Sequence, residues 1–411
     1  MTAIHKLGPN KAFLPYGRQT LDQEDLDAVV AVLQSDYLTT GPVCDLFEQA
    51  LASEVNARHA VVVSSGTAAL HLAALALGLG PEDSVIVPTM TFVATANAAR
   101  FVGAEVVFAD VDPNTGLMTP ETFLGAIERC SGRPRAVFPV HINGQSVELE
   151  ELYQLAKKHD MAIVEDACHA LGTTHLSKDS TESRVGASRY SDLTVFSFHP
   201  VKTIAMGEGG ALTTNDGDLA DRLRQLRNHG LTRNPAQFTN PELALSPEGT
   251  PNPWYYEMRE LAFNYRASDI HCALGLSQLK KLSTFVETRR TLVEHYCRRL
   301  EDLGEMVVPV ETAPWNDPAW HLFVAHIDFE SAGISRASLM NALKENGIGS
   351  QVHYLPVHLQ PYYSRRYGPL ELAGAESYYE RCLSLPLHGG MTANYVDRVI
   401  DTLRQILQIK I

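Results

Sequence analysis

The sequence predicts an α/β protein with a large three-layer domain, built on a mostly parallel sheet, and a smaller C-terminal α/β domain. Between Ala60 and Asp166, short apolar runs alternate with longer helical segments, which is typical of parallel strands joined by helices. A long helical segment that begins at Ile270 separates this region from a shorter set of strands and helices. The chain has 411 residues, of which 45% are hydrophobic, and this is enough for two domains.

The chain is expected to begin with an extended arm over residues 1–20, because glycine and proline interrupt this polar stretch. Asp22 can cap the first helix, since an aspartate side chain accepts hydrogen bonds from the free N–H groups that follow it. The predicted apolar face of this helix consists of Leu26, Val29, Val30 and Leu33. After a loop over residues 38–42, the apolar positions of a second helix are Phe47, Leu51 and Val55.

The regular alternation follows. Continuous apolar runs such as 60–63 are typical of strands that are buried on both faces of a parallel sheet. The predicted strands of this region are 60–63, 84–88, 105–110, 136–140 and 162–166. The predicted helices are one that starts in the turn Ser64–His71 and those at 92–100, 119–129 and 147–159.

After Asp166 the pattern becomes less regular. We expect an exposed polar insertion at 177–189, and a proline-rich loop at 231–257 whose role the sequence leaves open. The remaining predicted strands are 193–198, 211–214, 320–327 and 350–354, and the remaining predicted helices are 218–228, 270–301, 335–346 and 394–408. The predicted domains are residues 21–269 and 270–411, preceded by the arm of residues 1–20.

Composition excludes several classes of protein. With 34 Lys and Arg against 48 Asp and Glu, the net charge of −14 disfavours a protein that binds nucleic acid through its phosphate backbone. The six cysteines form no CxxC pair, which argues against zinc and disulfides, predicts no metal site, and suits the reducing cytoplasm. We find no secretory signal pattern and no apolar run long enough to span a membrane.

The central feature is a lysine in a turn between two strands, within FSFHPVKTIAMGEGG at 196–210. Most lysines are solvated surface charges, but Lys202 has the apolar neighbours Phe198 and Val201. A desolvated lysine has a lowered pKa, which an amine that attacks a carbonyl group requires. The glycines allow the backbone to approach closely, and the Ser197 hydroxyl could bind an anion. Our hypothesis is a lysine that binds pyridoxal 5′-phosphate (PLP).

Other segments supply the groups that such a site needs. The turn Ser64–His71 joins a strand to a helix N-terminus and can bind an anion, although a plain turn capped by Ser65 would show the same pattern. Asp166 can pair with a pyridine nitrogen, or it can act as a helix cap or salt-bridge partner. His169 could contact the ring hydroxyl, and Phe92 could stack on the ring or belong to the core. These residues follow strand ends, where parallel sheets bind ligands.

The motifs SSGTAALH, PTMTFVATANAA, VEDACHALG, FSFHPVKTIAMGEGG, FNYRASDI and WHLF occur in this order over nearly the whole chain. They resemble the motifs of the DegT-type sugar-nucleotide aminotransferases, which implies fold type I and PLP as cofactor. By this resemblance Lys202 would bind PLP covalently, Asp166 would pair with its ring nitrogen, Phe92 would stack on the ring and His169 would lie near the ring hydroxyl. The residues implied to hold the phosphate are Gly66, Thr67, Ser197 and, from the second subunit of a homodimer, Asn264.

The resemblance also implies a UDP-linked 4-keto-6-deoxy sugar as amino acceptor and L-glutamate as donor. The implied sugar-nucleotide contacts are Tyr16, Asp36, Tyr37, Leu38, Thr39, Ser197, Asn264, Trp320, His321, Leu322 and Phe323. One alternative is a transaminase that acts at C3 or C4 of another nucleotide sugar. A PLP dehydratase of the same family would carry histidine in place of Lys202, so the lysine speaks against it. A PLP-binding regulator without turnover is disfavoured by the acidic charge.

Overall fold

The computed structural model describes residues 13–408, so the predicted N-terminal arm is described only from Phe13 onward. Its centre is a seven-stranded sheet with the order β1-β9-β8-β5-β4-β2-β3, in which only β9 runs antiparallel to its neighbours. The strands are β1 (His59–Val63), β2 (Asp83–Pro88), β3 (Glu105–Ala109), β4 (Arg133–Val137), β5 (Ala162–Asp166), β8 (Leu193–Ser197) and β9 (Gly210–Thr214). The predicted mostly parallel sheet is therefore confirmed.

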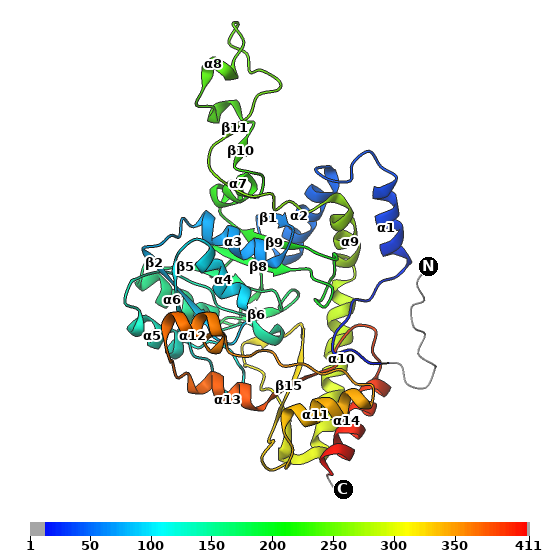
Figure 1. The fold of residues 1–411 in the computed structure, drawn as a ribbon. Coiled ribbons are helices and arrows are strands. Elements are labelled where there is room, and N and C mark those ends of the chain that lie inside the picture. Colours follow the sequence, from blue (N-terminus) through cyan, green and yellow to red (C-terminus); the bar gives the residue numbers. More distant parts are fainter. Residues whose placement is uncertain (1–12, 409–411) are drawn as a thin grey trace.

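Helices cover both faces of this sheet (Figure 1). They are α2 (Pro42–Val55), α3 (Gly66–Ala76), α4 (Val93–Phe101), α5 (Pro120–Arg129), α6 (Leu149–Lys158), α7 (Gly217–Leu226) and α9 (Asp269–Leu279). In β1, Val61 and Val63 belong to the core shared with α3, whereas Ala60 and Val62 belong to the core shared with α2. Because successive strand residues point to opposite faces, this alternation produces the three layers that the sequence predicts.

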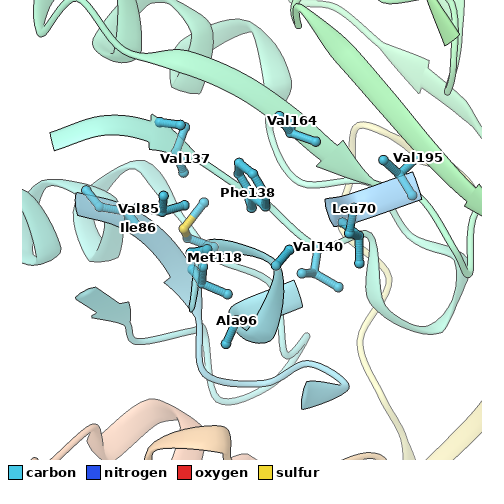
Figure 2. Close-up of a cluster of buried hydrophobic side chains, with 14 of the residues drawn as sticks. Leu70, Val85, Ile86, Ala96, Met118, Val137, Phe138, Val140, Val164 and Val195 are labelled. Atoms are coloured by element: carbon cyan, nitrogen blue, oxygen red, sulfur yellow. The ribbon is translucent and has the colours of Figure 1, made fainter. Parts of the chain in front are cut away.

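Figure 2 shows the larger of the two cores, where side chains of the sheet and of helices α3 and α4 meet. Leu70 of α3 and Ala96 of α4 lie over the strand residues Val85, Val137 and Val195. Strands with runs of buried apolar residues, such as Val85, Ile86 and Val87 of β2, can pack on both faces. The strand ends beyond this core are consequently held in fixed positions.

A second sheet of three antiparallel strands forms the smaller, C-terminal part. Its elements are β12 (Val307–Pro309), β14 (Phe323–Ile327), β15 (Cys382–Leu385), α10 (Leu282–Leu300), α11 (Arg336–Glu345) and α14 (Ala393–Leu407). Between them α12 (Pro361–Tyr367) and α13 (Ala373–Arg381) return to the large core, to which Tyr363 and Tyr378 contribute. The domain limits at 21–269 and 270–411 stay a prediction.

Two predicted elements of this part are wrong. The helix expected at 270–301 is two helices, α9 and α10, with a break at Lys280 and Lys281. No glycine or proline marks this break, but Lys281 is bonded to Asp22 and Asp25 at the start of α1 (Gln23–Leu33), at 2.7 and 2.8 Å. The segment 350–354 is not a strand, because only Gln351 forms a bridge, to Ser384 of β15.

Two expectations about exposure are also wrong. The segment 177–189 is not simply an exposed insertion. It contains β7 (Glu182–Arg184), paired with β6 (Thr174–Leu176) in a small sheet with β13 (Asn316–Asp317), and Val185, Ala187 and Ser188 after this strand are buried. On α1, Leu26, Val30 and Leu33 are 53, 47 and 55% exposed, because the helix packs on α9 through Asp25 and Val32 instead.

The proline-rich segment at 231–257 is a hairpin that projects from the body beyond α7 (Figure 1). Its base is formed by β10 (Leu231–Thr232) and β11 (Glu257–Met258), and its outer part carries the short helix α8 (Pro241–Ala244). Across residues 13–408, no helix has both the length and the apolar character needed to cross a membrane.

Candidate functional site

Lys202 lies in the loop that joins β8 to the antiparallel β9. The loop is held by its own backbone, since the Lys202 N–H donates to the His199 carbonyl at 2.8 Å and the Met206 N–H donates to the Phe198 carbonyl at 2.9 Å. At its end, a Cβ on Gly210 would lie 2.4 Å from the backbone of Ser65, so only glycine fits there. This close approach places the Lys202 loop directly beside the start of α3.

The start of α3 is built to accept an anion. The Ser65 side chain caps the helix by accepting from the Ala68 N–H at 3.1 Å, and the preceding N–H groups of Gly66 and Thr67 have no partner within the helix. A Cβ on Gly66 would lie 2.9 Å from the Cβ of Ser197, so the glycine keeps the Ser197 hydroxyl next to these N–H groups. Free N–H groups, the helix dipole and a hydroxyl together suit a phosphate.

Asp166 ends β5 and is buried. Its Oδ2 accepts from the Thr95 hydroxyl at 2.7 Å, and its Oδ1 accepts from the Cys168 N–H at 3.2 Å. The second bond is a local cap, as the sequence also allowed, but each carboxylate oxygen can accept a further bond. Asp166 can therefore fix the turn after β5 and still pair with a protonated ring nitrogen.

The environment of Lys202 favours its neutral amine. Burial lowers the pKa of Lys202, while the nearby Cys168 and Asp166 oppose this shift. Burial likewise holds the pKa of His169 and His321 well below the usual range, and that of His353 at about 3. The amine consequently has neutral, not cationic, imidazoles around it.

Four side chains with aromatic rings, those of Tyr354, His169, His321 and Phe92, lie together in the site. The Tyr354 hydroxyl and His169 Nε2 are 3.0 Å apart, and the His169 and His321 ring centroids are 4.4 Å apart. Phe92 lies at the start of α4, 58% exposed, with its ring centroid 6.1 Å from that of Tyr354. An exposed aromatic face beside polar groups is the arrangement that a stacked ring requires.

These groups surround one cavity of about 570 Å³. The predicted site residues that line it are Tyr16, Gly66, Thr67, Phe92, Asp166, His169, Ser197, Lys202 and His321. Their convergence follows from the parallel sheet, because the strand ends and the helix starts that follow them meet at one edge. Tyr16 arrives from the N-terminal arm and contacts the ring of His353, with centroids 5.4 Å apart.

The other predicted contacts lie away from this cavity. Trp320 packs against the core of the C-terminal part. Leu322 is buried in the core of the large sheet and Phe323 in the core of the C-terminal part, where the ring centroids of Phe323 and Tyr296 are 4.3 Å apart. We therefore propose no substrate contact for Leu322 or Phe323. Asp36, Tyr37, Leu38, Thr39 and Asn264 are exposed, and Thr39 forms a bridge to Ser268. These five residues thus lie on adjoining segments that do not line the cavity.

The next helix, α9, is capped by Ser268, whose side chain accepts from the His271 N–H, whereas Asn264 forms a backbone bridge to Asn228. Capping of α9 therefore comes from Ser268 and leaves the side chain of Asn264 for another role.

Sequence reasoning missed one wall of the cavity, the segment Gln351–Tyr354, which we call the distal wall. The sequence pattern predicted a strand here. The polar and aromatic residues of QVHY were the available signal that this segment lines a binding site. Thr95, which bonds Asp166, was also missed because it lies within an ordinary helical pattern.

The residues present fit PLP by their chemistry. The α3 N-terminus with Ser197 matches a phosphate, Asp166 matches a protonated pyridine nitrogen, and the neutral Lys202 amine matches an aldehyde. His169 Nδ1 is buried without a partner among the described residues, whereas its Nε2 is 3.0 Å from the Tyr354 hydroxyl in the cavity. Residues 13–408 hold no cluster of three or more His, Cys, Asp or Glu suited to a metal.

The fold and the site define an α/β enzyme that carries its cofactor on a lysine. The chain belongs to the DegT/DnrJ/EryC1/StrS aminotransferase family, whose model matches residues 19–404. It is therefore a PLP-dependent aminotransferase of this family, as its motifs predicted.

Known proteins that it resembles support this conclusion. It is 38% identical, over 96% of this chain and 97% of the relative, to the spore coat polysaccharide biosynthesis protein SpsC of Bacillus subtilis. Among solved structures, Helicobacter pylori PseC, an aminotransferase of pseudaminic acid biosynthesis, matches with a TM-score of 0.84 and 29% identity over 96% of this chain and 99% of PseC. A putative sugar aminotransferase from Streptococcus pneumoniae in its PLP form matches with a TM-score of 0.83 and 25% identity, covering 96% and 99% of the chains.

Proposed function

We propose that the protein transfers an amino group from L-glutamate to a UDP-linked keto-sugar in the cytoplasm. The main support for this chemistry is that Lys202, whose pKa is lowered by burial, lines the same cavity as Asp166 and the N-terminus of α3. In this proposal PLP stores the amino group between the two half-reactions and accepts the electrons released when a C–H bond breaks.

Each wall residue has a defined task in this scheme. Gly66, Thr67 and Ser197 bind the phosphate, and Asp166 keeps the ring nitrogen protonated. Lys202, once released from the cofactor, removes and returns the proton at the reacting carbon, for which a lowered pKa suits it. Phe92 packs on the ring, and Tyr16 and His321 face the space left for the sugar.

The substrate that we propose is UDP-2-acetamido-2,6-dideoxy-β-L-arabino-hexos-4-ulose, aminated at C4 to UDP-4-amino-4,6-dideoxy-N-acetyl-β-L-altrosamine for pseudaminic acid biosynthesis. The likeness to PseC supports this choice. A second support is the segment GIGSQVHYLPVHLQPYY, which resembles the corresponding segment of transaminases with this substrate and contains the distal wall.

A second candidate is amination at C3 or C4 of another nucleotide sugar. The 38% identity to SpsC, a protein of spore coat polysaccharide biosynthesis, favours this candidate. A panel of UDP- and TDP-linked 3-keto and 4-keto sugars, each assayed with L-glutamate, separates the two. Preferred turnover of the UDP-linked 4-keto sugar supports the first candidate, and preference for a 3-keto or TDP-linked sugar supports the second. Bound PLP without turnover of any sugar would favour a regulator.

We further propose that the active unit is a homodimer whose sites are shared. The exposed apolar residues of α1, Leu26, Val30 and Leu33, together with Tyr37 and Leu46, form a surface of the kind that subunit interfaces cover. Asn264 is exposed and lies near the loop 36–39, which adjoins these apolar residues. In the dimer it would contact the phosphate of the PLP bound by the partner subunit. A two-fold dimer would complete both sites at once.

Complementation tests the shared site. A Lys202→Ala subunit is mixed with an Asn264→Ala subunit, and turnover is compared with that of each parent alone. One of the two sites in each heterodimer would be intact, so activity should rise above both parents. If subunit exchange is demonstrated and activity does not rise, the sites are not shared.

A further inference from the structure

A hydrogen bond joins the distal wall to the turn that follows β5. The Tyr354 hydroxyl lies 3.0 Å from His169 Nε2, and both side chains line the cavity. The two residues come from different parts of the chain, His169 from the turn after β5 and Tyr354 from the segment bridged to β15. The bond therefore exists only because the two parts of the fold are packed together.

The proton in this bond can be assigned by elimination. His169 is neutral, because burial and the charge of Lys202 lower its pKa, so its ring carries one N–H. Its Nδ1 is buried and has no partner among residues 13–408. A buried N–H without an acceptor is costlier and rarer than an unused lone pair. The proton therefore belongs on Nε2, which donates it to the Tyr354 oxygen.

This assignment leaves the proton of Tyr354 free for another acceptor. Burial raises the pKa of Tyr354 well above its ordinary value, so the hydroxyl stays protonated. On the proposed cofactor, the phosphate is matched by α3 and Ser197, the ring nitrogen by Asp166 and the aldehyde by Lys202. The ring hydroxyl oxygen is the acceptor that remains.

We propose that the Tyr354 O–H donates a hydrogen bond to the ring hydroxyl oxygen of PLP, and that His169 acts as a positioning residue that orients this donor. The inference rests on the proposed PLP site, and it changes the assignment made from the sequence, in which His169 itself contacts that oxygen. Through this bond, Tyr354 of the distal wall would influence the pKa of the bound cofactor.

A donor on an ionised oxygen stabilises the ionised form and makes the neighbouring imine nitrogen less basic. His169 is bonded to Tyr354, the charges of Asp166, Cys168, Tyr16 and Tyr378 act on Tyr354 electrostatically, and those of Lys202 and His353 act on His169. Apart from Lys202, which is joined to the cofactor, these groups are unchanged in a Tyr354→Phe variant. A change in the titration of the PLP–Lys202 absorbance band then reports the lost hydroxyl.

The experiment is a spectrophotometric pH titration of the PLP-loaded protein. Tyr354→Phe should raise the midpoint by about one pH unit, the size expected for a hydrogen bond to a charged oxygen. Tyr378→Phe is the matched control, because Tyr378 is also buried and its hydroxyl is bonded to Asn143 at 3.0 Å outside the cavity. His169→Phe should raise the midpoint by less, and the double variant should match Tyr354→Phe alone.

Two results would overturn the proposal. The first is a Tyr354→Phe midpoint equal to that of Tyr378→Phe, and the second is a larger shift in His169→Phe than in Tyr354→Phe. If Tyr354→Phe does not fold, the His169→Phe variant still decides, because loss of the orienting group must also raise the midpoint. A wild-type protein that forms no PLP–lysine band would instead refute the proposed site, so the two failures are distinguishable.

Discussion

The two walls of the cavity are built in different ways. On the sheet side, Gly66, Asp166, Ser197 and Lys202 each lie at a strand end, at a helix start or in the short loop after a strand. On the other side, the distal wall is irregular and is joined to β15 at Ser384, by a bridge from Gln351 and by a bond between His353 Nδ1 and the Ser384 hydroxyl at 2.7 Å. The sheet side uses local backbone geometry, and most of the residues that we propose to bind PLP lie there. The distal wall depends on long-range packing, and through the proposed Tyr354 bond a change in this packing would also affect the cofactor.

The comparison predicts that loss of Lys202 has the largest effect. Lys202→Ala should lose transamination almost completely, because both the covalent tether and the proton-transferring amine disappear. Borohydride reduction followed by peptide mapping should place the PLP adduct on Lys202 in the wild type, and Lys157→Ala serves as a surface control. An adduct mapped to another lysine would contradict the assignment.

Asp166→Asn should retain PLP but react about a hundred-fold more slowly or worse, because a neutral amide cannot keep the ring nitrogen protonated. The amide oxygen can still accept from the Cys168 N–H, and the amide NH2 can donate to the Thr95 hydroxyl, so the fold should persist. Single-turnover rates with glutamate measure the effect, and circular dichroism checks the fold. Near-wild-type rates would show that Asp166 is only a cap.

Gly66→Ala tests the geometry of the phosphate site. The new Cβ would lie 2.9 Å from the Cβ of Ser197, which should displace the Ser197 hydroxyl and weaken PLP binding about tenfold or more. Gly80→Ala is the control, since its Cβ would meet no atom within 4 Å. Equal PLP dissociation constants for the two variants would show that the space around Gly66 is unimportant.

The smallest effect concerns the C-terminal side, where buried histidines are frequent. Burial lowers the pKa of His326 from 6.5 to about 4, so below about pH 6.5 the unfolded chain binds a proton that the folded protein does not. Stability should therefore fall as the pH decreases from 6.5 towards 4, by about 2 kcal/mol from this residue.

Urea unfolding at several pH values measures this loss. His326→Phe keeps the ring contact with Tyr378, whose centroid is 5.0 Å away, and should flatten the pH dependence. The exposed His159→Gln should leave it unchanged. An unaltered slope in His326→Phe would place the acid sensitivity elsewhere.

The sequence by itself determined the elements that obey local rules. Apolar runs of strand length, the Ser65 cap and the alternation of strands with helices predicted the parallel sheet. The sheet in turn predicted that Gly66, Phe92 and Asp166 would meet at its edge, and all three line the cavity. This worked because burial on both faces leaves a periodic pattern, and because the carboxyl ends of parallel strands share one edge.

Only the tertiary structure decided what depends on contacts between distant segments. The break between α9 and α10 coincides with the bonds of Lys281 to Asp22 and Asp25, for which no local residue type gives a signal. The exposed face of α1 has the same pattern as a buried one, since periodicity reports amphipathicity and not the partner that covers it. The Tyr354–His169 bond joins residues 185 positions apart, and only packing of the two parts brings them within 3.0 Å.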